Sequence, residues 1–129
     1  MAEGDIQNRG RLAASKRGLA TLFRNNVGTG WCGKVSRLTN GDILIKNPRP
    51  LHAGLCGGSG DTIGWRTITI TQEMVGRPVA VFVSAEFKTP TGRINPDQLH
   101  FAQTVTTAGG IGCIVRSPEE LVAALEGYA

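Results

Sequence analysis

The sequence has few of the residues that build disulfide, metal-thiolate or membrane-spanning structures. Its 129 residues include three cysteines and two histidines. The cysteines show no Cys-x-x-Cys spacing, and their odd number favours a reducing setting. No apolar run approaches the roughly 18 residues that span a membrane. Since no signal peptide is evident either, we expect no membrane association and a cytoplasmic location.

Aromatic residues are also scarce at 5%, whereas glycine is abundant at 18 residues. The chain is 40% hydrophobic and 19% charged, which is typical of one globular domain over residues 1–129. The net charge of +4 is uneven, because residues 1–60 carry +6 and residues 61–129 carry −2. The basic part would attract a polyanion such as nucleic acid.

Local patterns predict an α/β fold. Acids at the start and Gly18 at the end favour a helix over residues 3–17, and Asn95, Pro96 and Gln98 form an N-terminal capping signature for another. Ser117 and Glu120 form a similar capping box. The remaining expected elements are strands 19–26, 61–71, 79–88 and 112–115, a hairpin 35–45 with an Asn40-Gly41 turn, an irregular loop 48–60, and a helix 118–126.

Residues 28–34 match the glycine and lysine spacing of a phosphate-binding loop. Val35, however, stands where a hydroxyl is needed to bind magnesium, and the following residues do not open a helix. A nucleotide-binding protein using Gly28 to Lys34 is therefore a minor alternative.

The stretch Val79 to Lys88, VAVFVSAEFK, ends an apolar strand with an acid and a base. Residues two apart on a strand share a face, about 6.6 Å apart along the chain, so Glu86 and Lys88 should project together. Phe87 should point into the opposite layer. Because apolar residues lie on both faces, we expect a central strand that is covered on both sides, with strand 61–71 as an antiparallel neighbour.

That pairing would bring Asp61 near Glu86. Two carboxylates and the carbonyl oxygen of Phe87 would form a hard-oxygen site suited to Mg²⁺ or Mn²⁺. Lys88 would position a water or stabilise transition-state oxygens. The plain alternative is a surface ion pair, since Glu-x-Lys is a common tripeptide.

Basic and amide side chains in several segments are candidates for DNA contact. A solvated helix face explains Arg9 and Lys16 equally well, and Asn25 has turn formation as its alternative. The candidates are Arg9, Lys16, Arg24, Asn25, Asn26, Arg49 and Arg93, together with Arg37 and Lys46.

Four segments resemble one known family. They are FRNNVG (23–28), GLCGGSGDTIGW (54–65), AEFKTPTGRINPDQLHF (85–101) and AGGIGCIVRSPEEL (108–121). Together they are similar to the virus-type replication-repair nuclease (VRR-NUC) domain of the PD-(D/E)xK superfamily, in its small stand-alone versions from phages and prophages. Gly60 stands where the superfamily motif has proline.

The resemblance implies a metal-dependent nuclease on a restriction-endonuclease-like core, with a central mixed sheet flanked by helices. It implies metal ligands at Asp61 and Glu86, a catalytic lysine at Lys88 and a functional glutamine at Gln98. Glu3 is the first-helix acid that the superfamily pattern would add as a ligand, with Asp5 as the fallback. Stand-alone members resemble Holliday-junction resolvases that act as homodimers.

We therefore expect a Mg²⁺- or Mn²⁺-dependent DNA endonuclease, structure-selective for branched DNA. The alternatives are a non-catalytic module that binds DNA structures and a nuclease that processes flaps or ends.

Overall fold

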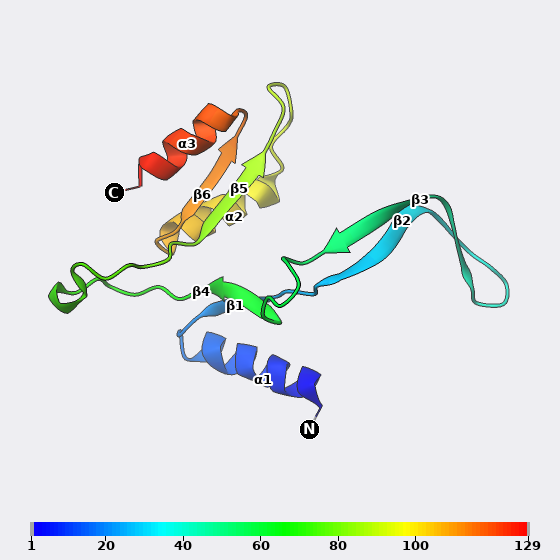
Figure 1. Cartoon of the computed structure of the whole chain (residues 1–129), viewed down its shortest axis with the longest axis horizontal. Coiled ribbons are helices and arrows are strands. Elements are labelled where there is room, and N and C mark those ends of the chain that lie inside the picture. The colour runs from blue at the N-terminus through cyan, green and yellow to red at the C-terminus, as the bar shows by residue number, and fades with distance from the viewer. Residues whose placement is uncertain (1, 129) are drawn as a thin grey trace. The chain divides into compact units, whose positions relative to one another are not determined.

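The computed structural model describes residues 2–128 as a mixed α/β chain with three α-helices and six strands. It divides into two compact units, one up to Gly64 and the other from Trp65 onward. Within each unit the elements can be followed in Figure 1. The general α/β class is confirmed. The described strands form three two-stranded sheets, β1–β4, β2–β3 and β5–β6, where the sequence predicted one central mixed sheet.

The first unit begins with helix α1, Glu3–Lys16, which packs against strand β1, Thr21–Arg24. The helix was predicted, and its start carries Glu3 and Asp5. β1 pairs with β4, Thr62–Trp65. At Gly64 these strands are so close that a Cβ atom would lie 1.8 Å from the Thr21 carbonyl oxygen, so the expected kink position is a site of close backbone approach.

Strands β2, Gly28–Arg37, and β3, Ile43–Ala53, form a long antiparallel hairpin. The hairpin was predicted, but it is longer than expected and its connection spans residues 38–42 with Gly41 at φ 92°. Residues 48–53 were predicted as part of the irregular loop 48–60, but they belong to β3, which contains Pro48 and Pro50. Proline is tolerated there since both strands of a two-stranded ribbon are edge strands.

The second unit contains a short 3₁₀ turn, Gln72–Met74, then strand β5, Val83–Phe87, and helix α2, Pro96–Thr107. Strand β6, Ile111–Val115, and helix α3, Pro118–Glu126, follow. β5 and β6 pair in parallel, as a crossover through α2 requires.

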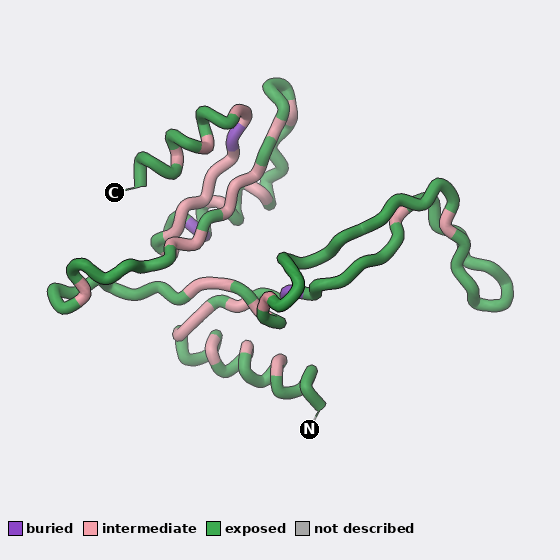
Figure 2. Tube along the Cα trace, viewed as in Figure 1, coloured by how far each residue is buried: buried purple, intermediate pink, exposed green. Residues whose placement is uncertain are grey.

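Val105 of α2 is buried against the strands, and Val115 of β6 is buried on the opposite sheet face, which it shares with Phe87 (Figure 2). α2 packs on both strands and α3 packs on β6. Trp65 contacts Phe82, with ring centroids 5.0 Å apart, and Phe101 at 6.3 Å. Gly112 lets α2 approach closely, because a Cβ atom there would lie 2.0 Å from the Ala102 carbonyl oxygen.

Three expectations about strands 61–71 and 79–88 were wrong. Only residues 62–65 and 83–87 form strands, and their partners are β1 and β6 instead of each other. Ile68 and Ile70 are exposed, and residues 66–71 pair with no strand among the described residues, although Thr and Ile alternate there. β5 is not covered on both faces, since the Phe87 side chain is 62% exposed.

Candidate functional site

Glu86 and Lys88 lie together at the carboxyl end of β5, as the two-residue period predicted. The Lys88 ammonium nitrogen is 3.4 Å from Glu86 Oε1. The Lys88 side chain is 19% exposed and that of Glu86 is 40% exposed. This partly desolvated pair therefore faces α2, the helix that packs on β5, while Phe87 points to the exposed side.

Gln98 joins this pair from the first turn of α2. Its Nε2 donates a hydrogen bond of 2.6 Å to Glu86 Oε1. Its Oε1 accepts a 3.1 Å hydrogen bond from the Asn95 amide, and Asn95 Oδ1 accepts from the Asp97 amide at 2.8 Å. The capping box was predicted and is confirmed. Gln98 thus caps the helix and orients the Glu86 carboxylate at the same time, and we name Glu86, Lys88 and Gln98 the carboxylate cluster.

Arg116, which the sequence reasoning missed, holds the loop that follows Lys88. Its Nη1 donates hydrogen bonds to the carbonyl oxygens of Thr89 (2.5 Å), Pro90 (3.2 Å) and Gly92 (2.9 Å). The Lys88 amide donates to the Val115 carbonyl at 2.9 Å. Main-chain acceptors carry no residue-type signal, so an arginine that follows a strand gives no hint of them in the sequence.

The predicted capping box of α3 is present in part. Ser117 Oγ accepts a hydrogen bond from the Glu120 amide at 3.1 Å. The Glu120 carboxylate accepts from the Arg116 amide at 2.6 Å, one residue earlier than a capping box requires. This contact attaches the start of α3 to the residue that holds the loop after β5.

Asp61 lies in the first unit, directly before β4. Its carbonyl oxygen accepts hydrogen bonds from the Asn25 amide at 2.8 Å and from Gln7 Nε2 at 3.4 Å, and its side chain is exposed. Gln7 is one helical turn after Glu3, so both residues lie on the same face of α1. Asp61 and Glu86 belong to different units, and their meeting stays a prediction.

Asn25 organises the loop that leads to Asp61. The residue is buried, and its Nδ2 donates to Ser59 Oγ and to the Gly60 carbonyl, each at 2.8 Å. Its Oδ1 accepts from the Leu55 amide at 3.0 Å. These bonds favour the turn-forming alternative for Asn25.

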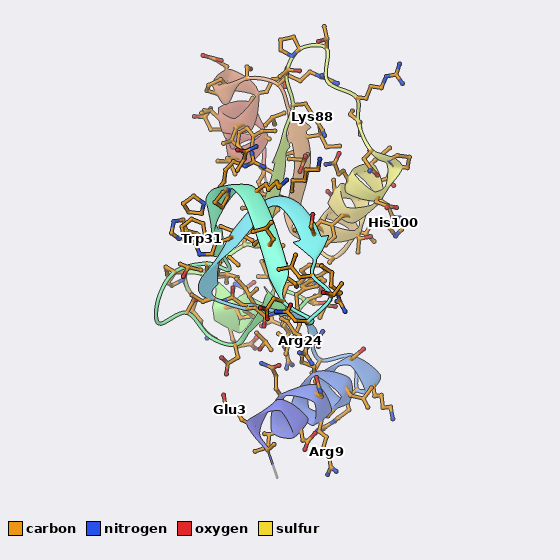
Figure 3. The ribbon with its side chains drawn as sticks, turned by 90° about the vertical axis from the view of Figure 1, so that its right-hand side faces the viewer. Glu3, Arg9, Arg24, Trp31, Lys88 and His100 are labelled. Carbon is orange, nitrogen blue, oxygen red and sulfur yellow. The ribbon has the colours of Figure 1, made fainter. Side chains whose placement is uncertain are left out.

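The other predicted DNA-contact residues are exposed. Figure 3 shows Glu3 and Arg9 extending from α1. Arg24 donates a 2.6 Å hydrogen bond to Asn8 Oδ1. Within residues 2–128 the only salt bridge is that of Glu86 with Lys88, so these cations make no ion pair there. The exposed set comprises Arg9, Lys16, Arg24, Asn26, Arg49 and Arg93.

The described residues contain no group of three or more His, Cys, Asp or Glu side chains that could hold a metal ion. The second unit by itself offers one carboxylate, Glu86, beside the carbonyl oxygen of Phe87. These are hard oxygen donors of the type that Mg²⁺ prefers, and Mg²⁺ sites commonly use one or two carboxylates with waters and substrate phosphates. The donor chemistry of Glu86 and of the Phe87 carbonyl therefore fits a divalent cation.

Residues 28–35 do not form a phosphate-binding loop. They belong to β2, and a Cβ atom at Gly33 would lie 2.6 Å from the Lys46 carbonyl oxygen of the paired strand. A phosphate-binding loop needs free backbone amides that lead into a helix. The nucleotide-binding alternative thus has no geometric basis.

Among residues 2–128, none of the helices has both the length and the apolar character needed to cross a membrane. Comparisons of this chain with protein-family models, curated proteins and solved structures yield no match.

Proposed function

We propose that this protein is a Mg²⁺- or Mn²⁺-dependent DNA endonuclease with a restriction-endonuclease-like core, and that it acts on branched DNA. The observation that carries the proposal is the carboxylate cluster. Glu86 Oε1 accepts a 2.6 Å hydrogen bond from Gln98 Nε2 and lies 3.4 Å from Lys88 Nζ. A surface ion pair needs two partners, whereas here a third group from another element fixes the carboxylate.

The cluster leaves Glu86 Oε2 without a hydrogen bond among the described residues, so this oxygen can accept a cation. Asp61 would supply the second carboxylate and Phe87 its carbonyl oxygen. A bound divalent cation would lower the pKa of a coordinated water and neutralise charge on the phosphodiester.

The side chains of Gln98 and Lys88 have separate roles in the proposed reaction. Gln98 holds the Glu86 carboxylate in one orientation, and Lys88 places a positive charge where the scissile phosphate gains negative charge. Water oxygen bonds to phosphorus while the P–O bond on the opposite side breaks. Glu3 is a further candidate ligand, because it shares a helix face with Gln7, which contacts the Asp61 main chain.

Branched DNA is proposed as substrate from the family resemblance and from charge. The first sixty residues carry +6, which favours a partner with high phosphate density. A junction has paired strands to cut, and a C2 homodimer would supply two related sites.

The test is cleavage of a synthetic four-way junction in Mn²⁺, beside flapped, linear and single-stranded DNA. Asp61→Ala, Glu86→Ala and Lys88→Ala should each lower the cleavage rate by about 100-fold or more. Glu73→Ala is the matched control, because it removes an exposed carboxylate elsewhere and should cut like the parent. Parental rates in the three site variants would refute the assigned site. Faster cleavage of flaps or ends than of junctions would identify a flap- or end-processing nuclease.

A second candidate function is a module that binds DNA structures without cutting them. The favouring observation is that Lys88 and Gln98 already compensate the Glu86 carboxylate, so the cluster is stable without a cation. Junction binding with no cleavage in Mg²⁺, Mn²⁺ or Co²⁺ would establish this alternative.

A further inference from the structure

The β2–β3 hairpin presents two different faces, which follow from its register. Residues paired across an antiparallel ribbon point to the same side, and so do alternate residues along a strand. Lys34 is paired with Lys46 and Cys32 with Arg49. On β2, Cys32 and Lys34 are two residues apart, so both pairs lie on one face. We name Lys34, Lys46 and Arg49 the basic face.

A bulge creates this arrangement. Between the two pairs β2 has one residue, Gly33, whereas β3 has two, Asn47 and Pro48. Asn47 has φ 51°, in the left-handed region that a bulge can require. The extra residue shifts the alternation of β3, so that Lys46 and Arg49 point to the same side although they are three residues apart.

The basic face has no compensating acid. Asp42 is the only acidic residue in residues 28–53, and it lies in the turn, bonded to Asn40. Lys34, Lys46 and Arg49 are exposed and make no ion pair within residues 2–128. Like charges that are directly opposed, with Cβ atoms about 4.5–5.5 Å apart, destabilise a ribbon. The hairpin therefore gains stability when an anion binds between the strands.

The opposite face carries more apolar side chains, although Arg37 also lies on it. Trp31 is 63% exposed and Val35 is 60% exposed, and Ile43 shares their side through its pairing with Arg37. The Trp31 side chain can be seen in Figure 3. In both strands every residue is exposed except Cys32 and Ile45, which are half-buried (Figure 2). No other described element of the first unit packs on either face, and a bare two-stranded ribbon is marginally stable in water.

We propose that the basic face of the β2–β3 hairpin binds the sugar-phosphate backbone of duplex DNA. A two-stranded ribbon fits the major groove of B-DNA. On β2 the rows Lys34–Lys46 and Cys32–Arg49 are about 6.6 Å apart, so their cations can reach separate phosphates of the backbone. A second copy of the chain would place like charges together on this face, so charge complementarity favours the polyanion.

This inference shares its DNA partner with the proposed nuclease, so its test measures binding without cleavage. Duplex and junction DNA would be titrated by fluorescence anisotropy in Ca²⁺ or EDTA at several salt concentrations. The variant is Lys34→Gln with Lys46→Gln. The matched control is Arg66→Gln with Arg77→Gln, which removes the same charge from exposed positions outside the hairpin.

The hairpin variant should bind at least tenfold more weakly at about 0.1 M salt, and its salt-dependence slope should fall by about 2. The control should keep a slope close to the parent's. The midpoint of thermal unfolding of the hairpin variant should be unchanged or higher, because a like-charge pair has been removed. This measurement separates lost contacts from lost folding.

An unchanged slope in the hairpin variant, or a loss equal to that of the control, would overturn the inference. A change of sedimentation mass with parental DNA affinity would also overturn it, and would identify the hairpin as an interface between copies. If the parent binds DNA but cuts none in Mn²⁺, the nuclease proposal fails, while the hairpin inference stands when the variant shows the expected loss of binding. If the parent cuts DNA and the hairpin variant binds DNA like the parent, the nuclease proposal stands and the hairpin inference fails.

Discussion

At the scale of single residues, the position of Gln98 requires a side chain that both accepts and donates a hydrogen bond. One end of its side chain accepts the Asn95 amide, and the other donates to Glu86. Capping alone would be satisfied by glutamate or glutamine at this position. Only glutamine also donates to a carboxylate, so the Glu86 contact explains the choice between the two.

The capping contact and the Glu86 contact of Gln98 can be separated by two substitutions, which should affect stability and cleavage rate differently. Gln98→Glu keeps a capping acceptor but replaces the donor to Glu86 with a second carboxylate, so its free energy of unfolding should fall by about 1–3 kcal/mol. Its cleavage rate should fall about tenfold or more, because a hydrogen bond to a charged group is lost. Chemical denaturation and junction cleavage in Mn²⁺ measure the two quantities.

Asn95→Ala is the counterpart, since it removes the cap and leaves the Glu86 contact. It should cost about 1 kcal/mol of stability with little change in the cleavage rate. Equal losses of rate in both variants would mean that helix capping, and not the orientation of Glu86, matters for activity.

At the scale of elements, the connection between β5 and α2 is held by one arginine. The Arg116 side chain donates to three carbonyl oxygens of residues 89–92, and its backbone amide donates to the Glu120 carboxylate. A guanidinium has several donors in a fixed plane, which suits several acceptors in one loop. The loop that carries the chain from Lys88 to Gln98 thus depends on the end of β6.

Arg116→Gln should lower the free energy of unfolding by about 1–3 kcal/mol, because carbonyl oxygens lose a charged donor. It should also speed proteolysis within residues 89–94. Arg93→Gln is the control, because this exposed arginine of the same loop should change neither quantity. Denaturant titration and limited proteolysis measure both, and equal behaviour of the two variants would contradict the assigned role.

Two glycines predict opposite results of the same substitution. Gly10 lies within α1 with open space around its Cβ position, so Gly10→Ala should raise the free energy of unfolding by about 1 kcal/mol. Gly112→Ala should lower it by about 1–3 kcal/mol, because the new methyl group would meet the Ala102 carbonyl. Thermal and denaturant unfolding of both proteins test this contrast.

At the scale of the whole molecule, the proposed metal ligands come from two units, Asp61 from the first and Glu86 from the second. A cation bound by both carboxylates would stabilise the folded protein by mass action. Mn²⁺ should therefore raise the midpoint of thermal unfolding of the parent.

Asp61→Asn and Glu86→Gln should each abolish that rise, whereas Glu73→Gln should keep it. At a Mn²⁺ concentration of about 100 times Kd the stabilisation corresponds to about 2.7 kcal/mol. A full rise in Asp61→Asn would show that Asp61 does not share the site with Glu86.

The sequence by itself determined the features that depend on neighbouring residues. Asn95, Pro96 and Gln98 predicted the start of α2, the acids and Gly18 predicted α1, and the period of two placed Glu86 beside Lys88. Capping bonds and strand periodicity join residues within a few positions, so the local pattern contains nearly all of the relevant interactions.

Only the tertiary structure decided which strands pair and which distant groups meet. β4 pairs with β1 and β5 with β6, although the pattern favoured a neighbour relation between residues 61–71 and 79–88. Arg116 bonds to the Thr89 carbonyl, and Asn25 bonds to Ser59. In each case the two partners are more than twenty residues apart in the sequence. Backbone donors and acceptors are the same in every residue, so a sequence carries little information about which distant ones will bind each other.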